Sequence, residues 1–127
     1  KILGTELWKS EESLKSTPAL YGSWFASVPD NMFNQFRTRY RARYQSNPYR
    51  LASLGYDAVL LAVRIGQDWP VGQPFPEAEL RNEEGFMGVD GAFRFGESGI
   101  AQRTLEVLQV SPGGFTTVSP APKGFGG

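Results

Sequence analysis

Hydrophobic residues recur with a helical period in two consecutive stretches of the chain. The first stretch has large apolar residues at spacings of three and four, namely Met32, Phe33, Phe36, Tyr40 and Tyr44. Asp30 or Asn31 is placed to cap its first turn. Asn47 and Pro48 end the pattern, and the next stretch is apolar over most of a helical surface. The pattern predicts an amphipathic helix over 31–45 and a buried helix over 51–67.

Shorter apolar runs predict strands on either side of these helices. Ile2 and Leu3 read as the end of a buried strand, and residues 20–28 as a second strand. The period changes to two after Phe93, where residues 101–118 predict an antiparallel hairpin that turns at Pro112-Gly113-Gly114. Short helices are expected at two places, 9–17 and 77–81. Strands and helices in this order indicate the α/β class, with three layers.

Composition removes several classes of function. The thirteen basic and thirteen acidic residues balance, so no global field attracts nucleic acid or an anionic membrane. The chain has neither His nor Cys, which excludes a Ser/His/Asp triad, a thiol nucleophile and an ordinary zinc site within it. We therefore expect a protein that is not an enzyme and that needs no cofactor and no metal.

Four arginines occupy alternate positions in the first predicted helix: Arg37, Arg39, Arg41 and Arg43. Because a helix turns by 3.6 residues, these side chains spread around the cylinder instead of forming one stripe. The spacing favours a solvated face over an anion-binding site.

Three segments occur in an order that is typical of one family. They are the F-x-x-x-Y-x-x-x-Y-x-x-x-P pattern from Phe36 to Pro48, the run Tyr56-Asp57-Ala58-Val59, and the run from Gly88 to Phe95 with Gly99. Together they resemble the final third of leucine-binding-like periplasmic proteins of the type I fold. The resemblance implies that residues 1–119 are the C-terminal portion of such an α/β domain, ending in the antiparallel hairpin. Residues 120–127 are then expected to form a disordered Pro/Gly tail.

Two functions follow from the resemblance and remain open. The first is a solute-binding protein of an amino-acid ABC transporter. The second is suggested by residues 3–8 and 24–26, which resemble penicillin-binding protein activators, the envelope lipoproteins that promote peptidoglycan synthesis through protein contacts. Both imply a periplasmic protein, lipid-anchored in the second case through an N-terminus absent here. The implied partners are a membrane transporter or a penicillin-binding protein.

The resemblance also implies a ligand site near the start of the chain. In amino-acid-binding relatives an acidic residue in the loop after this strand meets the ligand's ammonium group, and Glu6 occupies that place beside Thr5. A carboxylate there is physically suited to the role, although a solvated loop glutamate explains Glu6 equally well. Trp8 and Tyr56 are further candidates for the cleft, with the hydrophobic core as the alternative for both. Asp57 is expected to pair with a neighbouring group as a structural residue.

The same family crosses between two lobes several times, so this segment is expected to supply pieces to both. The apolar helix over 51–67 and the strand at 1–3 would then lack neighbours that the first part of such a protein provides. We expect the 127-residue chain to self-associate or to bind the missing N-terminal part.

Overall fold

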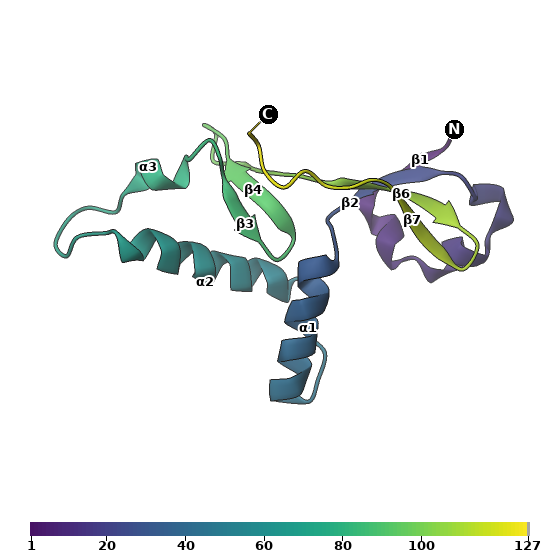
Figure 1. Cartoon of the computed structure of the whole chain (residues 1–127), viewed down its shortest axis with the longest axis horizontal. Helices are drawn as coiled ribbons and strands as arrows, with labels where there is room; N and C mark the ends of the chain where they lie inside the picture. The colour runs from purple at the N-terminus through teal and green to yellow at the C-terminus, as the bar shows by residue number, and fades with distance from the viewer. Residues whose placement is uncertain (127) are drawn as a thin grey trace.

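The chain folds into two bodies joined by extended crossings, as Figure 1 shows. The structure is a computed structural model that describes residues 1–126. One body, the sheet body, contains four strands and three short 3-10 helices. The strands are β1 (Leu3–Gly4), β2 (Trp24–Ser27), β6 (Glu106–Ser111) and β7 (Gly114–Ser119), and the 3-10 helices are η1 (Glu6–Ser10), η2 (Glu12–Ser16) and η3 (Pro18–Leu20). The other, the helical body, contains three helices and three strands. They are α1 (Asn31–Tyr44), α2 (Ala52–Gln67), α3 (Glu77–Leu80), β3 (Phe86–Gly88), β4 (Gly91–Phe95) and β5 (Ala101–Arg103).

The sheet body is one mixed sheet in the order β1-β2-β6-β7. β1 runs parallel to β2, whereas β2 with β6 and β6 with β7 pair antiparallel. Alternate residues of β2 and β6 are buried, as the period-two pattern requires, and Phe25 and Val110 are 2% and 0% exposed. The 3-10 helices add Leu14 to this core, in place of the single helix expected over 9–17.

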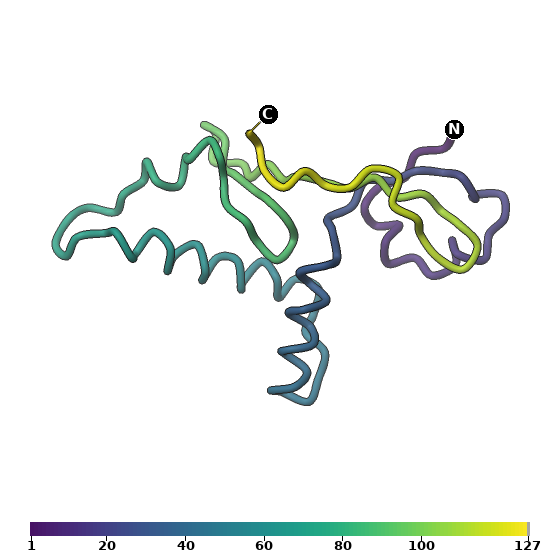
Figure 2. The backbone as a smooth tube through the Cα atoms, viewed as in Figure 1, coloured from purple at the N-terminus to yellow at the C-terminus, as the bar shows by residue number. Residues whose placement is uncertain are grey.

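The predicted terminal hairpin is confirmed in β6 and β7. Ser111 pairs with Gly114, so Pro112 and Gly113 form a two-residue turn. Proline fixes φ at its position and Gly113 supplies a positive φ of 74°, a combination suited to a tight turn. The hairpin is shorter than the expected range of 101–118, because residues 101–103 form β5, which pairs with β4 in the other sheet, and β6 starts at Glu106. Residues 104–105 carry the chain from the helical body to the sheet body (Figure 2).

The helical body confirms both long helices within one residue at each end. Its small antiparallel sheet has the order β3-β4-β5, and β3 was not predicted from the sequence. Asp30 is at the N-cap of α1 but forms no capping hydrogen bond, and its carboxylate instead pairs with Lys9 Nζ at 3.0 Å. The α/β class is therefore as expected, whereas β3 and the three 3-10 helices depart from the expected order of elements.

The expectation that α2 is buried is wrong for this chain. Only Ser53, Asp57 and Ile65 of α2 are buried, while Val59 and Val63 are 64% and 55% exposed. The small sheet and α1 cover part of the helix, and no other described element covers the rest. Apolar composition predicted a hydrophobic surface correctly, but it could not say what packs on that surface.

The accessible surface of the chain is large for its mass. A folded monomer of 14.0 kDa exposes about 6,700 Å² by the usual size scaling. The chain exposes 8905 Å². The excess, roughly 2,200 Å², follows from the two-body shape.

The last residues return from β7 toward the helical body, as the yellow end of the tube in Figure 2 shows. There the guanidinium of Arg94 lies 4.5 Å from the centre of the Phe125 ring. The division into a domain at 1–119 and a disordered tail at 120–127 stays a prediction, and Gly127 lies outside the described residues.

Candidate functional site

A cavity of about 430 Å³ lies where the two bodies meet. The sheet body contributes the start of η1 and the end of β2, and the helical body contributes the start of α2 and the ends of β5 and of the β3–β4 turn. The lining residues are Glu6, Leu7, Lys9, Ser10, Ser27, Val28, Arg50, Leu51, Ser53, Leu54, Asp90 and Arg103. Because both bodies supply walls, we call this space the interbody cavity.

A charged network forms the helical side of the interbody cavity. Arg50 Nη1 donates to Asp90 Oδ1 at 2.7 Å and to Ser53 Oγ at 3.0 Å, and the Ser53 hydroxyl donates to Asp90 Oδ2 at 2.7 Å. The Asp90 side chain is only 7% exposed, so both carboxylate oxygens need these donors. Arg50 also lies over the Phe33 ring at 4.1 Å. This triangle holds one carboxylate and one guanidinium in fixed positions.

Arg103 adds a second cation to the same wall. Its guanidinium lies 5.0 Å from the centre of the Phe93 ring, and its Nη1 is buried without a hydrogen-bond partner among the described residues. Arg103 also lines the interbody cavity, and a guanidinium carries five N–H donors and no acceptor. Arg103 can therefore receive an anionic group.

Asp57 lies behind this wall and is structural, as predicted. It is 4% exposed, and its Oδ1 accepts the Val89 N–H at 2.8 Å, while Oδ2 has no partner among residues 1–126. Burial raises the pKa of Asp57, the nearby Asp90 charge raises it further, and the Val89 hydrogen bond opposes both. A Cβ at Gly88 would overlap Asp57 Oδ2, so a residue without a side chain is needed at position 88.

The structure separates the four residues predicted for the ligand site. Glu6 is exposed in the first turn of η1 and lines the interbody cavity, and Thr5 precedes it as the N-cap, also exposed. Trp8 packs over Gly4 and lies 6.0 Å from Phe25, against the core of the sheet body. Tyr56 lines a different hollow. Glu6 is therefore the one predicted residue that borders the interbody cavity.

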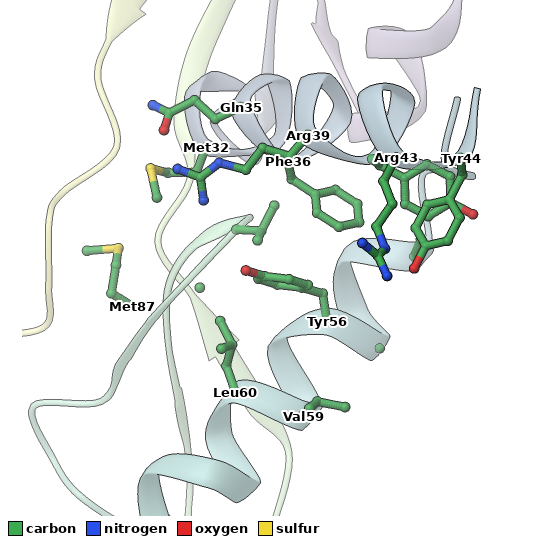
Figure 3. Close-up of a pocket in the computed structure, with 15 residues that line it drawn as sticks. Met32, Gln35, Phe36, Arg39, Arg43, Tyr44, Tyr56, Val59, Leu60 and Met87 are labelled. Carbon is green, nitrogen blue, oxygen red and sulfur yellow. The ribbon is translucent and has the colours of Figure 1, made fainter. Parts of the chain in front are cut away.

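Tyr56 belongs to a groove of about 600 Å³ between α1 and α2, which we call the helix groove. Its ring lies 5.0 Å from Phe36, and Figure 3 shows both rings between the two helices with Arg43 and Tyr44 beside them. Phe36, Tyr40 and Tyr44 follow one another along α1 with ring separations of 5.9 and 4.6 Å. These contacts make Tyr56 part of an aromatic surface on the helical body.

Sequence reasoning missed the charged wall of the interbody cavity. Arg50 and Asp90 are 40 positions apart, and Arg103 sits in a strand where an exposed arginine is ordinary. The one available signal was position: each of these residues lies at the end of an element, where α/β folds place ligand contacts.

Two further properties bear on the class of protein. No helix within residues 1–126 is long and apolar enough to cross a bilayer. In the same part of the chain, no group of three acidic side chains is gathered in a way that could hold a metal ion.

The fold is similar to a portion of the leucine-binding-like type I periplasmic binding proteins, a class of substrate-binding proteins of ABC transporters. No protein-family model matches the sequence, and no curated protein matches it. The likeness is therefore one of structure.

Individual solved structures show how far the likeness extends. A putative branched-chain amino acid ABC transporter protein from Rhodospirillum rubrum is 25% identical, with a TM-score of 0.72 over 91% of this chain. The leucine binding protein LivK from Thermotoga maritima is 22% identical, with a TM-score of 0.55 over 93% of this chain. An extracellular ligand binding receptor from Desulfohalobium retbaense is 21% identical, with a TM-score of 0.58. The chain spans 36%, 36% and 22% of the lengths of these proteins.

Proposed function

We propose that the chain forms part of the ligand-binding unit of an extracytoplasmic, non-catalytic protein that binds an amino acid for an ABC transporter. The observation that carries the proposal is the interbody cavity, where both bodies place charged groups of opposite sign around one space. Its volume of about 430 Å³ falls within the roughly 300–1,000 Å³ usual for small-molecule sites. The likeness to substrate-binding proteins supports the same class of ligand.

The cavity lining suits the three parts of an apolar amino acid. Glu6 offers a carboxylate to an ammonium group, and the guanidinium of Arg103, on the opposite wall, offers N–H donors to a carboxylate. Leu7, Leu51 and Leu54 line the same space and are 75%, 74% and 46% exposed. A ligand with an aliphatic side chain would cover these leucines, which favours branched-chain amino acids.

Binding between two bodies also gives the ligand a mechanical role. Glu6 belongs to the sheet body, whereas Arg103 belongs to the helical body. A ligand that contacts both is bound more tightly when the bodies approach each other, so it shifts the population toward the closed arrangement. A membrane transporter can recognise such a closed form, and the proposed function therefore includes a periplasmic location.

The test is an NMR titration of the 127-residue chain with L-leucine. We expect saturable shifts of amides around the interbody cavity, and Glu6→Gln should weaken binding about tenfold because a charge-assisted hydrogen bond becomes a neutral one. Glu97→Gln makes the same chemical change at an exposed turn outside the cavity and should leave the affinity unchanged. Equal affinities in both variants, or no response to leucine, would contradict the proposal.

The alternative is an envelope lipoprotein that activates penicillin-binding proteins. The exposed apolar surface of α2 favours protein contact, which this function needs. A chain that ignores leucine and other amino acids, but is retained by an immobilised penicillin-binding protein, would support the alternative over the solute-binding proposal.

A further inference from the structure

The helix groove has an apolar floor made by two helices. α1 contributes Phe36 and Tyr40, and α2 contributes Tyr56, Val59 and Leu60. The side chains of Tyr56, Val59 and Leu60 are 41%, 64% and 45% exposed, although each is large and apolar. Figure 3 shows Tyr56 and Leu60 pointing from α2 toward the space beneath α1. This floor is the kind of surface that a protein partner covers.

Positive charge borders one side of the helix groove. α1 contains four arginines and no acidic residue, a formal charge of +4. Arg39 and Arg43 line the helix groove, whereas Arg37 and Arg41 line a separate hollow on α1. Within residues 1–126 none of the four forms an ion pair. Arg39 and Arg43 are therefore free to meet acidic groups of whatever enters the groove.

The matching chemistry occurs at the opposite end of α2. Residues 68–84, which we call the acidic tip, contain five acidic residues and one arginine, a formal charge of −4. The tip also exposes apolar side chains: Trp69, Val71 and Phe75 are 40%, 103% and 46% exposed, and the Trp69 and Phe75 rings meet edge to face at 5.3 Å. Figure 1 places this segment at the far end of α2 from α1.

We propose that the helix groove binds the acidic tip of a second copy of this chain. The aromatic residues of the tip would cover the apolar floor, and its glutamates would meet Arg39 and Arg43 at the rim. In a dimer with two-fold symmetry each copy gives one tip and receives one, so the same contact forms twice. The inference does not rest on the proposed ligand, because it uses neither Glu6 nor the interbody cavity.

The exposed area is large enough for such an assembly. A stable interface of standard size covers about 800 Å² on each partner. The chain exposes roughly 2,200 Å² more than a folded monomer of its mass. One dimer contact therefore uses less than half of the excess. Opposite charges at its rim select this register over others, because like charges would face each other in a groove-to-groove or tip-to-tip arrangement.

A charge-exchange experiment tests the proposal by light scattering on the purified chain. The wild type should have twice the monomer mass at tens of micromolar, and its dissociation constant should rise with salt. The groove variant Arg39→Glu/Arg43→Glu and the tip variant Glu79→Arg/Glu83→Arg/Glu84→Arg should each dissociate about tenfold more readily. The first has an acidic groove rim and an acidic tip, and the second has a basic groove rim and a tip whose formal charge changes from −4 to +2. Mixing the two variants in equal amounts should restore the dimer, because every groove then finds a tip of opposite charge.

The matched control is Arg37→Glu/Arg41→Glu, which makes the same charge change on the same helix but away from the helix groove. It should leave the mass unchanged, and circular dichroism of each variant checks that it folds. A wild type that stays monomeric would overturn the proposal. A dimer whose dissociation constant is the same in the wild type, the groove variant and the tip variant would also overturn the proposal. It would indicate that the copies exchange strands at the open sheet edge instead. If the control variant also lost the dimer, and the mixture of groove and tip variants did not recover it, the charge effect would be nonspecific. That result would overturn the proposed contact between the acidic tip and the helix groove.

Discussion

Removing the hydroxyl of Ser53 tests whether the charged triangle stabilises the junction of the two bodies. Ser53 is fully buried at 0% exposure, and its hydroxyl links Asp90 and Arg50. Ser53→Ala keeps the Cβ, so it opens almost no cavity and leaves the backbone of α2 unchanged. The variant leaves Asp90 Oδ2 without its donor in a site that is nearly closed to water.

The magnitude follows from the contacts that remain. A hydrogen bond to a charged group contributes about 1.5–3 kcal/mol, and a buried acceptor left unpaired loses a similar amount. Arg50 still pairs with Asp90 Oδ1 at 2.7 Å, so the carboxylate keeps one partner. We expect the free energy of unfolding to fall by about 2 kcal/mol, which lowers the melting temperature by roughly 6–10 °C for a chain of this size.

Urea and thermal denaturation at one fixed protein concentration measure the effect, because self-association makes stability depend on concentration. Ser98→Ala is the control, since Ser98 is exposed in the turn before β5 and should change the free energy by less than about 0.5 kcal/mol. Equal stabilities of the two variants would refute the reasoning and would mean that the triangle contributes nothing beyond solvent contacts.

Two further predictions concern the buried Asp57. Its raised pKa means that the folded state holds the proton more tightly than the unfolded state, so the contribution of Asp57 to stability is fully present below the ordinary value of 3.8 and is lost as pH rises through the folded-state pKa. The difference in free energy of unfolding between Asp57→Asn and the wild type should therefore shift in favour of the variant as pH rises. Urea denaturation of both proteins at several pH values measures this difference, and a difference that does not change with pH would contradict the prediction. Gly88→Ala should lose about 1–3 kcal/mol, because the methyl group would overlap Asp57 Oδ2 and approach its Cγ to 2.7 Å. Gly66→Ala meets nothing within 4 Å and should instead gain up to about 1 kcal/mol, as calorimetry can check.

Local patterns in the sequence predicted most of the elements. The helices over 31–45 and 51–67 have enough periodic residues to be recognised, and the Pro112-Gly113 turn has its own chemistry. β3 was not predicted, because the segment Phe86–Gly88 is too short to show an alternation of apolar and polar residues. Its pairing with β4 depends instead on contacts that bring Phe86 opposite Phe93.

The candidate site could be predicted only in part, because its geometry depends on long-range contacts. Glu6 was found from its place after a strand, yet the groups it faces come from residues that are distant in sequence. Tyr56 was assigned to a cleft or to the core, and the structure places it in the helix groove. The spread of arginines around α1 was predicted, and it is this spread that puts Arg39 and Arg43 on one side of the helix and leaves Arg37 and Arg41 on another.

Lys9 connects these observations at the junction of the two bodies. Its Nζ lies 3.0 Å from Asp30 Oδ2, at the start of α1, and 3.4 Å from Glu106 Oε1, at the start of β6. Lys9 is on η1 with Glu6, so a rotation that moves Glu6 relative to Arg103 must also stretch the contact with Asp30. The Lys9 and Asp30 side chains are 26% and 38% exposed, and such a pair contributes at most about 1 kcal/mol. A contact this weak adds little to the resistance of the junction, so a ligand of the proposed kind that contacted both bodies would not have to overcome this pair to change the angle between them.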